Sequence, residues 1–166
     1  KIEQKGYYKN GKPTGKWLWD YEGGNILREE EFLGGVENGT LVEYSDSGNI
    51  IIKGQFVMGI KEGSWIYEMG DQKETGSYND GKKNGMWKHY YKNGNINFEG
   101  DFVDGDANGK CKYYYNSGKL KEDGTYVMGA KQGTWKKYDK DGALFVVSVF
   151  EGGVEVEVDG VKIKDD

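Results

Sequence analysis

The stretch Asp104–Gly109 carries the residue types of a calcium-binding loop. It reads DGDANG, which fits the D-x-[DN]-x-[DN]-G opening of an EF-hand, where carboxylate and amide oxygens bind the ion. An EF-hand also needs a bidentate glutamate at its twelfth position, and that position is Tyr115. The related stretches MGIKEG, DGKKNG and MGAKQG recur elsewhere in the chain. We therefore interpret the stretch as a junction between repeats and predict no metal site.

Other residues with catalytic chemistry are few. The single histidine, His89, lies in a predicted strand, and the single cysteine, Cys111, takes the place of a tryptophan in the repeat described below. One cysteine and one histidine cannot form a Cys/His zinc site within the chain, and no phosphate-binding or dinucleotide fingerprint occurs. We expect His89 to be a strand residue and Cys111 a small buried thiol. The sequence predicts no enzyme activity and no cofactor.

The composition favours a single all-β domain. The 166 residues include 28 glycines and 1 proline, and 14% are aromatic, which is typical of short strands joined by tight turns and not of disorder. The net charge of −5 disfavours nucleic-acid binding, which needs clustered Lys and Arg. The apolar runs are too short for stable insertion into a membrane.

The chain repeats every 24 residues or so. Counted from the first glycine of a repeat, positions 10 and 21 are always glycine and position 18 is always aromatic. Position 3 is tryptophan except at Leu41 and Cys111, and position 16 is glycine except at Glu30 and Ser148. The single domain 1–166 then divides into a half repeat 5–14, the repeats 15–38, 39–62, 63–84 (two residues short), 85–108, 109–132 and 133–156, and a C-terminal cap 157–166.

The dipeptides at positions 9 and 10 predict hairpins. Asn93-Gly94 and Asp141-Gly142 favour two-residue type I′ turns, which need positive φ at both residues. Such a turn places position 3 opposite position 16, and position 1 opposite position 18. Each large ring would then cover the backbone of the glycine across the hairpin.

Strand alternation assigns the two faces of the hairpins. The inner face takes positions 3, 5, 7, 12, 14, 16 and 18, and it includes Ile26, Ile50, Ile96, Leu120 and Leu144. The predicted structural core of the repeats is Trp17, Trp65, Trp87, Trp135, Phe32, Phe56, Tyr78, Phe102, Tyr126 and Phe150. The other face is polar and carries the position-6 tyrosines. Glu30 falls on the inner face, either paired with a cation or, as we prefer, at a solvated strand end.

One hairpin cannot bury its apolar side alone, so the hairpins must stack. We predict an all-β fold: an elongated single-sheet array of about six tandem antiparallel hairpins with a C-terminal capping hairpin. The run ALFVVSVF (143–150) is apolar on both faces. It either caps the stack, which we favour, or is an edge where a partner docks.

The pattern x-G-x-[FY]-x-x-G-x-x-x-G, seen in EGDFVDGDANG, KGQFVMGIKEG and TGSYNDGKKNG, resembles the MORN repeat. The other half of the repeat carries the motifs G-x-W-x-x-Y and N-G-x-[IL]. With this half included, the chain is more similar to the bacterial MORN-variant repeat, some members of which carry an antitoxin label. The resemblance covers nearly the whole chain. It implies an array of hairpins that serves as an interaction or assembly module, and it implies lipid association for some members.

The sequence thus predicts a non-catalytic scaffold that binds a protein, and edge-strand pairing is one route. The candidate partner-binding residues are Tyr44, Tyr90, Tyr114, Tyr138, Phe145, Val147 and Val149. One alternative is glycan or cell-wall binding through rows of aromatic rings, which requires exposed tryptophans. The other is lipid association at a membrane surface, against which the sparse junction lysines argue. A first residue other than Met and the bacterial resemblance favour an exported, envelope-associated protein over a cytoplasmic one.

Overall fold

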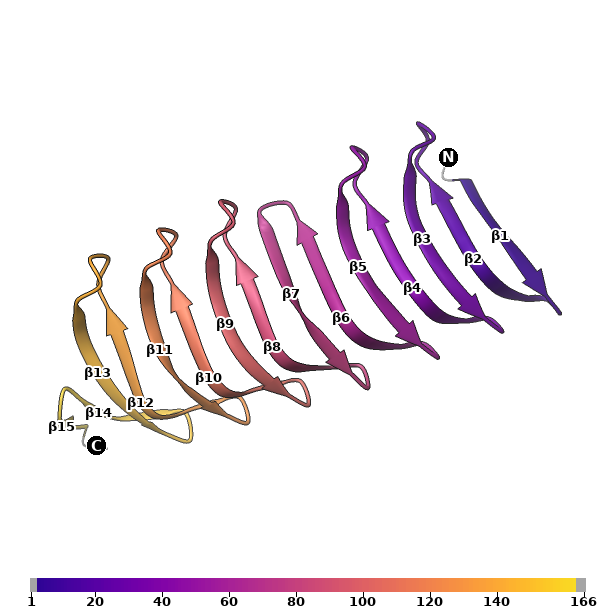
Figure 1. Cartoon of the computed structure of the whole chain (residues 1–166). Helices are drawn as coiled ribbons and strands as arrows, with labels where there is room; N and C mark the ends of the chain where they lie inside the picture. The colour runs from indigo at the N-terminus through magenta and orange to yellow at the C-terminus, as the bar shows by residue number, and fades with distance from the viewer. Residues whose placement is uncertain (1–2, 164–166) are drawn as a thin grey trace. The chain divides into compact units, whose positions relative to one another are not determined.

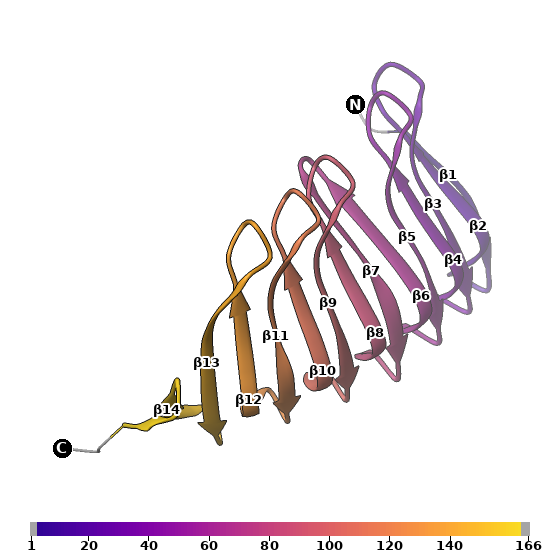
Figure 2. The ribbon, with the colours of Figure 1, turned by 60° about the vertical axis from the view of Figure 1, so that its left-hand side comes forward.

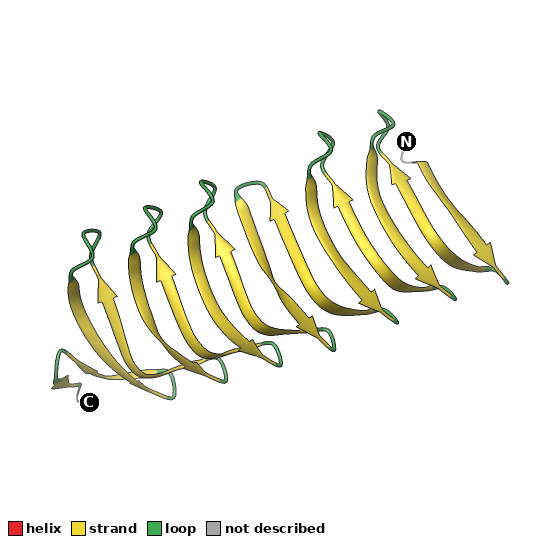
Figure 3. Cartoon of the chain, viewed as in Figure 1, coloured by secondary structure: helices red, strands yellow, loops and turns green. Residues whose placement is uncertain are grey.

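The computed structural model describes residues 3–163, which form fifteen β-strands and no helix (Figures 1 and 3). No helix long and apolar enough to cross a membrane occurs in this range. The chain divides into two compact units, Lys1–Lys82 and Lys83–Asp166, which we describe separately. Residues 164–166 of the predicted cap lie outside the described range.

The strands of each unit follow one another in chain order and pair antiparallel with their sequence neighbours. The first unit holds β1 (Glu3–Lys9), β2 (Lys12–Asp20), β3 (Ile26–Leu33), β4 (Val36–Tyr44), β5 (Ile50–Val57), β6 (Ile60–Met69) and β7 (Gln72–Asn79). The second begins within β8 (Lys82–Tyr90) and continues with β9 (Ile96–Val103), β10 (Asp106–Tyr114), β11 (Leu120–Val127), β12 (Ala130–Tyr138), β13 (Leu144–Glu151), β14 (Val154–Val158) and β15 (Val161–Lys162). The predicted all-β array of tandem antiparallel hairpins is confirmed.

The predicted register between positions 3 and 16 is also confirmed. Trp87 lies opposite Gly100 in β8 and β9, and Gly85 lies opposite Phe102. The same two pairings occur across β6 and β7, where Trp65 lies opposite Gly76 and Gly63 lies opposite Tyr78. Each repeat is therefore one hairpin with a fixed cross-strand pattern.

The predicted type I′ turn at positions 9 and 10 is wrong. Gly94 has φ 86°, but Asn93 before it is not in the left-handed region. The amide of Gly94 donates to the Tyr91 carbonyl oxygen (2.9 Å), and the Tyr91 amide donates to the Asn95 carbonyl oxygen (2.8 Å). These bonds enclose a three-residue loop, one residue longer than predicted. A bulge between positions 12 and 14 then shifts the register back, because it inserts one unpaired residue into the second strand.

The type I′ turns lie at the other end of the hairpins, at positions 20 and 21 (Figure 2 shows the wider loops and the tight turns at opposite ends of the strands). Asp104 and Gly105 have φ 52° and 98°, and they connect the paired residues Val103 and Asp106. The residue types of DGDANG are thus those that a type I′ turn requires. Asp159-Gly160 has the same geometry and joins β14 to β15, which confirms the predicted hairpin there.

The short third repeat keeps its register because both missing residues come from the loop end. Gly70 has φ 63° at the first central position of a two-residue turn, as in type II′. The strands β6 and β7 pair without a shift from Gly63 and Tyr78 to Met69 and Gln72. The deletion removes one loop residue and the bulge residue together, so no side chain changes face.

The bulge also corrects the predicted faces. Position 12 pairs with position 6, as Ile50 does with Tyr44, so it lies on the tyrosine face rather than the inner face. Accordingly Ile26, Ile50 and Leu144 are exposed. Buried hydrophobic residues on the inner face are Trp17, Leu41, Trp65, Trp87, Phe98, Cys111 and Trp135.

The aromatic residues at position 18 are half-buried and contact the tryptophans edge-on. Trp65 lies between Phe56 (5.2 Å between ring centroids) and Tyr78 (5.7 Å), and Trp135 lies between Tyr126 (5.0 Å) and Phe150 (6.1 Å). Such edge-to-face contacts stabilise the stack by roughly 0.5–1.5 kcal/mol each beyond their buried area. Trp17 contacts Phe32 and Trp87 contacts Phe102 in the same way.

At Gly54 and Gly124 the ring that covers the position-16 glycine comes from the following hairpin, not from the same hairpin as predicted. A methyl group on Gly54 would overlap the Trp65 ring, and one on Gly124 would overlap Trp135. Where Cys111 replaces tryptophan, the ring of Phe98 covers Gly100 instead, and a methyl group there would lie 2.7 Å from Cζ.

Hydrogen bonds outside the strands also connect successive hairpins. The position-7 hydroxyl groups donate to the position-6 carbonyl oxygens of the next repeat, from Tyr21 to Tyr44 (2.8 Å) and from Tyr91 to Tyr114 (2.7 Å). At the opposite end, the Gly129 amide donates to the Ala107 carbonyl oxygen (2.9 Å). The hairpins of each unit are therefore joined at both ends.

Candidate partner-binding surface

His89 and Cys111 occupy structural positions. The His89 ring is half-buried in β8 and lies 5.1 Å from the ring of Phe98. Cys111 is buried in β10, and that burial raises the pKa of its thiol to about 12, which keeps it protonated and unreactive at neutral pH. Within residues 3–163 no three His, Cys, Asp or Glu side chains gather in a way that could hold a metal ion.

Glu30 is buried, so the predicted solvated strand end is wrong and the cation-paired alternative is correct. Its side chain is 3% exposed, and Oε2 accepts a hydrogen bond from Arg28 Nη2 at 2.7 Å. Arg28 also pairs with Glu43 (3.1 Å) and lies over the Trp19 ring (5.5 Å). Burial raises the pKa of Glu30, and the Arg28 hydrogen bond opposes that rise.

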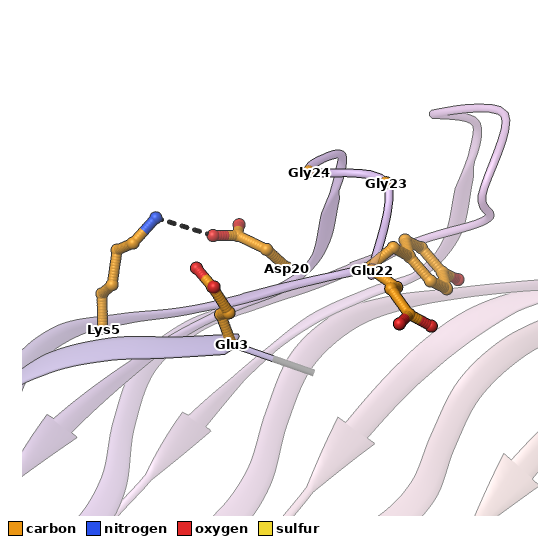
Figure 4. A pocket seen from close by; sticks show the side chains of 7 residues that line it. Glu3, Lys5, Asp20, Glu22, Gly23 and Gly24 are labelled. Atoms are coloured by element: carbon orange, nitrogen blue, oxygen red, sulfur yellow. Dashed lines mark hydrogen bonds and ion pairs between the residues drawn. The ribbon is translucent and has the colours of Figure 1, made fainter. Parts of the chain in front are cut away.

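A hollow of about 430 Å³ lies at the first hairpins of the first unit (Figure 4). Its wall includes Glu3, Lys5 and Asp20, and the loop residues Gly23 and Gly24. The Lys5 ammonium is held by the Asp20 carboxylate at 2.9 Å, and this hydrogen bond raises the pKa of Lys5. The one lysine of the hollow is thus already paired, and the wall is mainly polar.

The tryptophans at position 3 are buried rather than exposed. Trp65 is 1% exposed, and Trp87 and Trp135 are 0% exposed. Lysine ammonium groups lie over these rings, with Lys83 Nζ 3.8 Å from the Trp87 centroid and Lys131 Nζ 3.9 Å from that of Trp135. Sugar rings therefore cannot stack on a row of tryptophans, which removes the observation on which the glycan hypothesis depended.

The predicted partner-binding tyrosines are half-buried, each opposite an isoleucine or leucine of the same hairpin. The pairs are Tyr44 with Ile50, Tyr90 with Ile96, Tyr114 with Leu120 and Tyr138 with Leu144. The Tyr114 hydroxyl donates to Glu99 Oε1 at 2.7 Å, and burial together with this bond raises its pKa to about 12.

The apolar run of the last repeat forms β13, which is paired on both edges. Val147 and Val149 are half-buried between β12 and β14, and Val149 lies opposite Glu157. They are not at an open edge. Phe145 differs, because 56% of it is exposed.

Two of the predicted residues, Tyr138 and Phe145, line one hollow of about 300 Å³ in the second unit. The rest of its wall is Tyr115, Lys121, Glu122 and Lys137. Tyr115 reaches this place because its hydroxyl donates to the Tyr138 carbonyl oxygen (2.8 Å). Sequence reasoning missed these four residues. The recurrence of tyrosine at position 7, in Tyr21, Tyr91 and Tyr115, was the signal that could have indicated this wall.

The fold and its sites define a tandem β-hairpin repeat protein, with one hairpin per repeat. Residues 83–104 and 107–128 match the family model described as MORN repeat variant, and they correspond to the hairpins β8–β9 and β10–β11. The resemblance to MORN-variant repeats is thereby confirmed for these two repeats.

No curated protein matches the sequence. One similar solved structure is a mutant of TarM from S. aureus in complex with Fondaparinux, alpha-GlcNAc-glycerol and UDP. It is 12% identical, with a TM-score of 0.29 over 72% of this chain and 21% of that chain. A similarity this weak supports no argument about function.

Proposed function

We propose that the chain is a non-catalytic repeat module that binds a protein partner at the hollow between β11 and β13. The observation that carries the proposal is the placement of Phe145. This large apolar side chain is 56% exposed and borders a hollow that is also lined by two tyrosines, Tyr115 and Tyr138. Exposed aromatic anchors beside a pocket are characteristic of protein interfaces.

The rest of the structure supports a binding role over a catalytic one. His89 is engaged in strand packing and the Cys111 thiol is held protonated, so neither is poised for catalysis. The repeated glycines, the position-3 tryptophans and the position-18 aromatic residues are also separate from the residues around the hollow. A partner site can therefore vary without loss of the hairpin stack, as in other repeat proteins.

Affinity capture from the native cell tests the proposal. The bait would be the full chain, the variant Phe145→Ala and the control Leu33→Ala, because Leu33 is also 56% exposed but lies in the first unit. The captured protein would then be purified and its dissociation constant measured against all three baits. We expect Phe145→Ala to weaken binding by about tenfold or more, and Leu33→Ala to leave it unchanged. Equal binding by all three baits, or specific turnover abolished by His89→Ala, would overturn the proposal.

A further inference from the structure

We infer that the hollow between β11 and β13 recognises an acidic segment of the partner, with a carboxylate next to an apolar side chain. This inference rests on the proposed function, because it specifies the chemistry of the partner at the same site. Two features of the hollow carry it: unbalanced positive charge and an exposed aromatic ring.

The first feature is the pair of lysines Lys121 and Lys137. Both line the hollow, and neither forms an ion pair with any residue of the described range 3–163. The one carboxylate of the wall, on Glu122, is neutralised by Lys131, whose Nζ lies 2.8 Å from Oε1. The hollow therefore presents two ammonium groups without a matching anion, and a carboxylate of the partner can be that anion.

The charge around the hollow is opposite in sign to that of the chain. Two lysines and one glutamate line the hollow, whereas the whole chain has a net charge of −5. A local positive patch on an acidic protein attracts an acidic segment in the correct orientation, and the remaining surface repels it elsewhere.

The second feature is the aromatic wall. Phe145 occupies the bulge position, where the preceding repeat has Lys121. A space of about 300 Å³ is at the lower limit of ligand pockets, so it suits one or two side chains rather than an extended oligomer. An acidic polysaccharide would use the same ammonium groups, but the buried tryptophans provide no row of rings to continue its binding. A peptide with alternating acidic and apolar side chains fits both features.

The test uses an amide-capped Glu-Phe-Glu-Phe peptide as the probe and the full chain labelled with ¹⁵N. Matched Lys-Phe-Lys-Phe peptide and polygalacturonate would be titrated in parallel. The test variant is Lys121→Glu with Lys137→Glu. The control is Lys110→Glu with Lys112→Glu, which changes the net charge equally at exposed lysines of the neighbouring β10. Thermal unfolding would check that all variants are folded.

We expect the acidic peptide to bind with a dissociation constant of roughly 0.1–1 mM and to shift the amide resonances of residues around the hollow. The test variant should bind about tenfold or more weakly, the control should bind normally, and higher salt should weaken the interaction. Three outcomes would overturn the inference. Equal loss of binding in both variants would show non-specific electrostatics, and binding of polygalacturonate alone would identify a glycan ligand. No binding of the acidic peptide would exclude an acidic segment as the ligand. If the captured partner still requires Phe145 but not these lysines, the inference fails while the proposed function stands.

Discussion

Glu30 in β3 and Leu41 in β4 are direct cross-strand partners, and both depart from the repeat. Elsewhere, as at Gly54 and Trp65, a tryptophan ring lies on the glycine of the preceding hairpin. A side chain at position 16 cannot share that space with an indole ring. The smaller Leu41 leaves room for the Glu30 carboxylate, which is buried against Arg28. The two departures are therefore one compensated change.

A double-mutant cycle tests this relationship. Leu41→Trp alone should destabilise the protein by about 1–3 kcal/mol, because the ring overpacks against Glu30. Adding Glu30→Gly removes the obstacle and recreates the regular pair, so the two changes should be coupled favourably by roughly 0.5–3 kcal/mol. Urea denaturation of the single and double variants measures the coupling. Simple additivity would mean that the two positions do not share the space.

Position 16 should tolerate a side chain only where no ring covers it. Gly124→Ala places a methyl group in the Trp135 ring, and we expect a loss of about 1–3 kcal/mol. Ser148 is the matched control, because its partner on the following strand β14 is Val158 rather than a tryptophan, although Trp135 is its partner on β12. Its buried Oγ has no hydrogen-bond partner within the described residues. Ser148→Ala should be neutral or stabilising in the same denaturation assay. Similar losses at both positions would disprove the covering role of Trp135.

The buried Glu30 predicts a pH-dependent stability. Since its pKa in the folded state is raised above the unfolded value of about 4.3, its ionisation destabilises the fold. Its contribution to stability is greatest below that value and falls as the pH rises through the folded pKa. Glu30→Gln removes this titration, so the variant should gain in urea midpoint relative to the parent between pH 4 and pH 7. A constant difference across that range would show that Glu30 does not titrate with a raised pKa.

Regular features of the sequence predicted most of the fold, because each repeat reports the same constraint. The periodic glycines and aromatic residues indicated the hairpins and the pairing of positions 3 and 16. The loop end was less predictable, since Asn93-Gly94 fits both a two-residue turn and a three-residue loop with a left-handed glycine. The bulge compensated for the extra residue. The register was therefore right although the turn was wrong, and only the face of position 12, as at Ile50, revealed the error.

The site was harder to predict than the fold because it depends on contacts between repeats. Strand alternation says which face a residue occupies, but not that Lys131 neutralises Glu122 and leaves Lys121 unpaired. Similarly, the sequence showed that Trp135 and Lys131 recur with the repeat, but not that the lysine covers the ring. Periodicity identified Tyr138 as a candidate and the apolar run 143–150 identified Phe145, and the structure alone brought them to a common hollow.

The Cys111 thiol should be inert in the folded protein. With its pKa raised to about 12, the thiolate fraction at pH 8 is roughly a thousandfold below that of a free cysteine. Iodoacetamide labelling followed by mass spectrometry should show slow modification in buffer that accelerates with rising pH. In denaturant the rate should reach that of a free cysteine. Rapid labelling of the native protein would mean that the site is open and the thiol activated.

Met128 is the residue whose replacement should stabilise the protein most simply. It occupies the first central position of a type I′ turn with φ 49°, and it is 79% exposed. An unbranched apolar residue is unfavourable both at a positive φ and at an exposed position. The equivalent turn of the preceding repeat has Asp104 at this place. Met128→Asn should therefore raise the free energy of unfolding by about 0.5–1 kcal/mol. The reciprocal change Asp104→Met should lower it by a similar amount, and both are measured by urea denaturation. If Met128→Asn is destabilising, the methionine makes a contact that outweighs the cost of its backbone conformation.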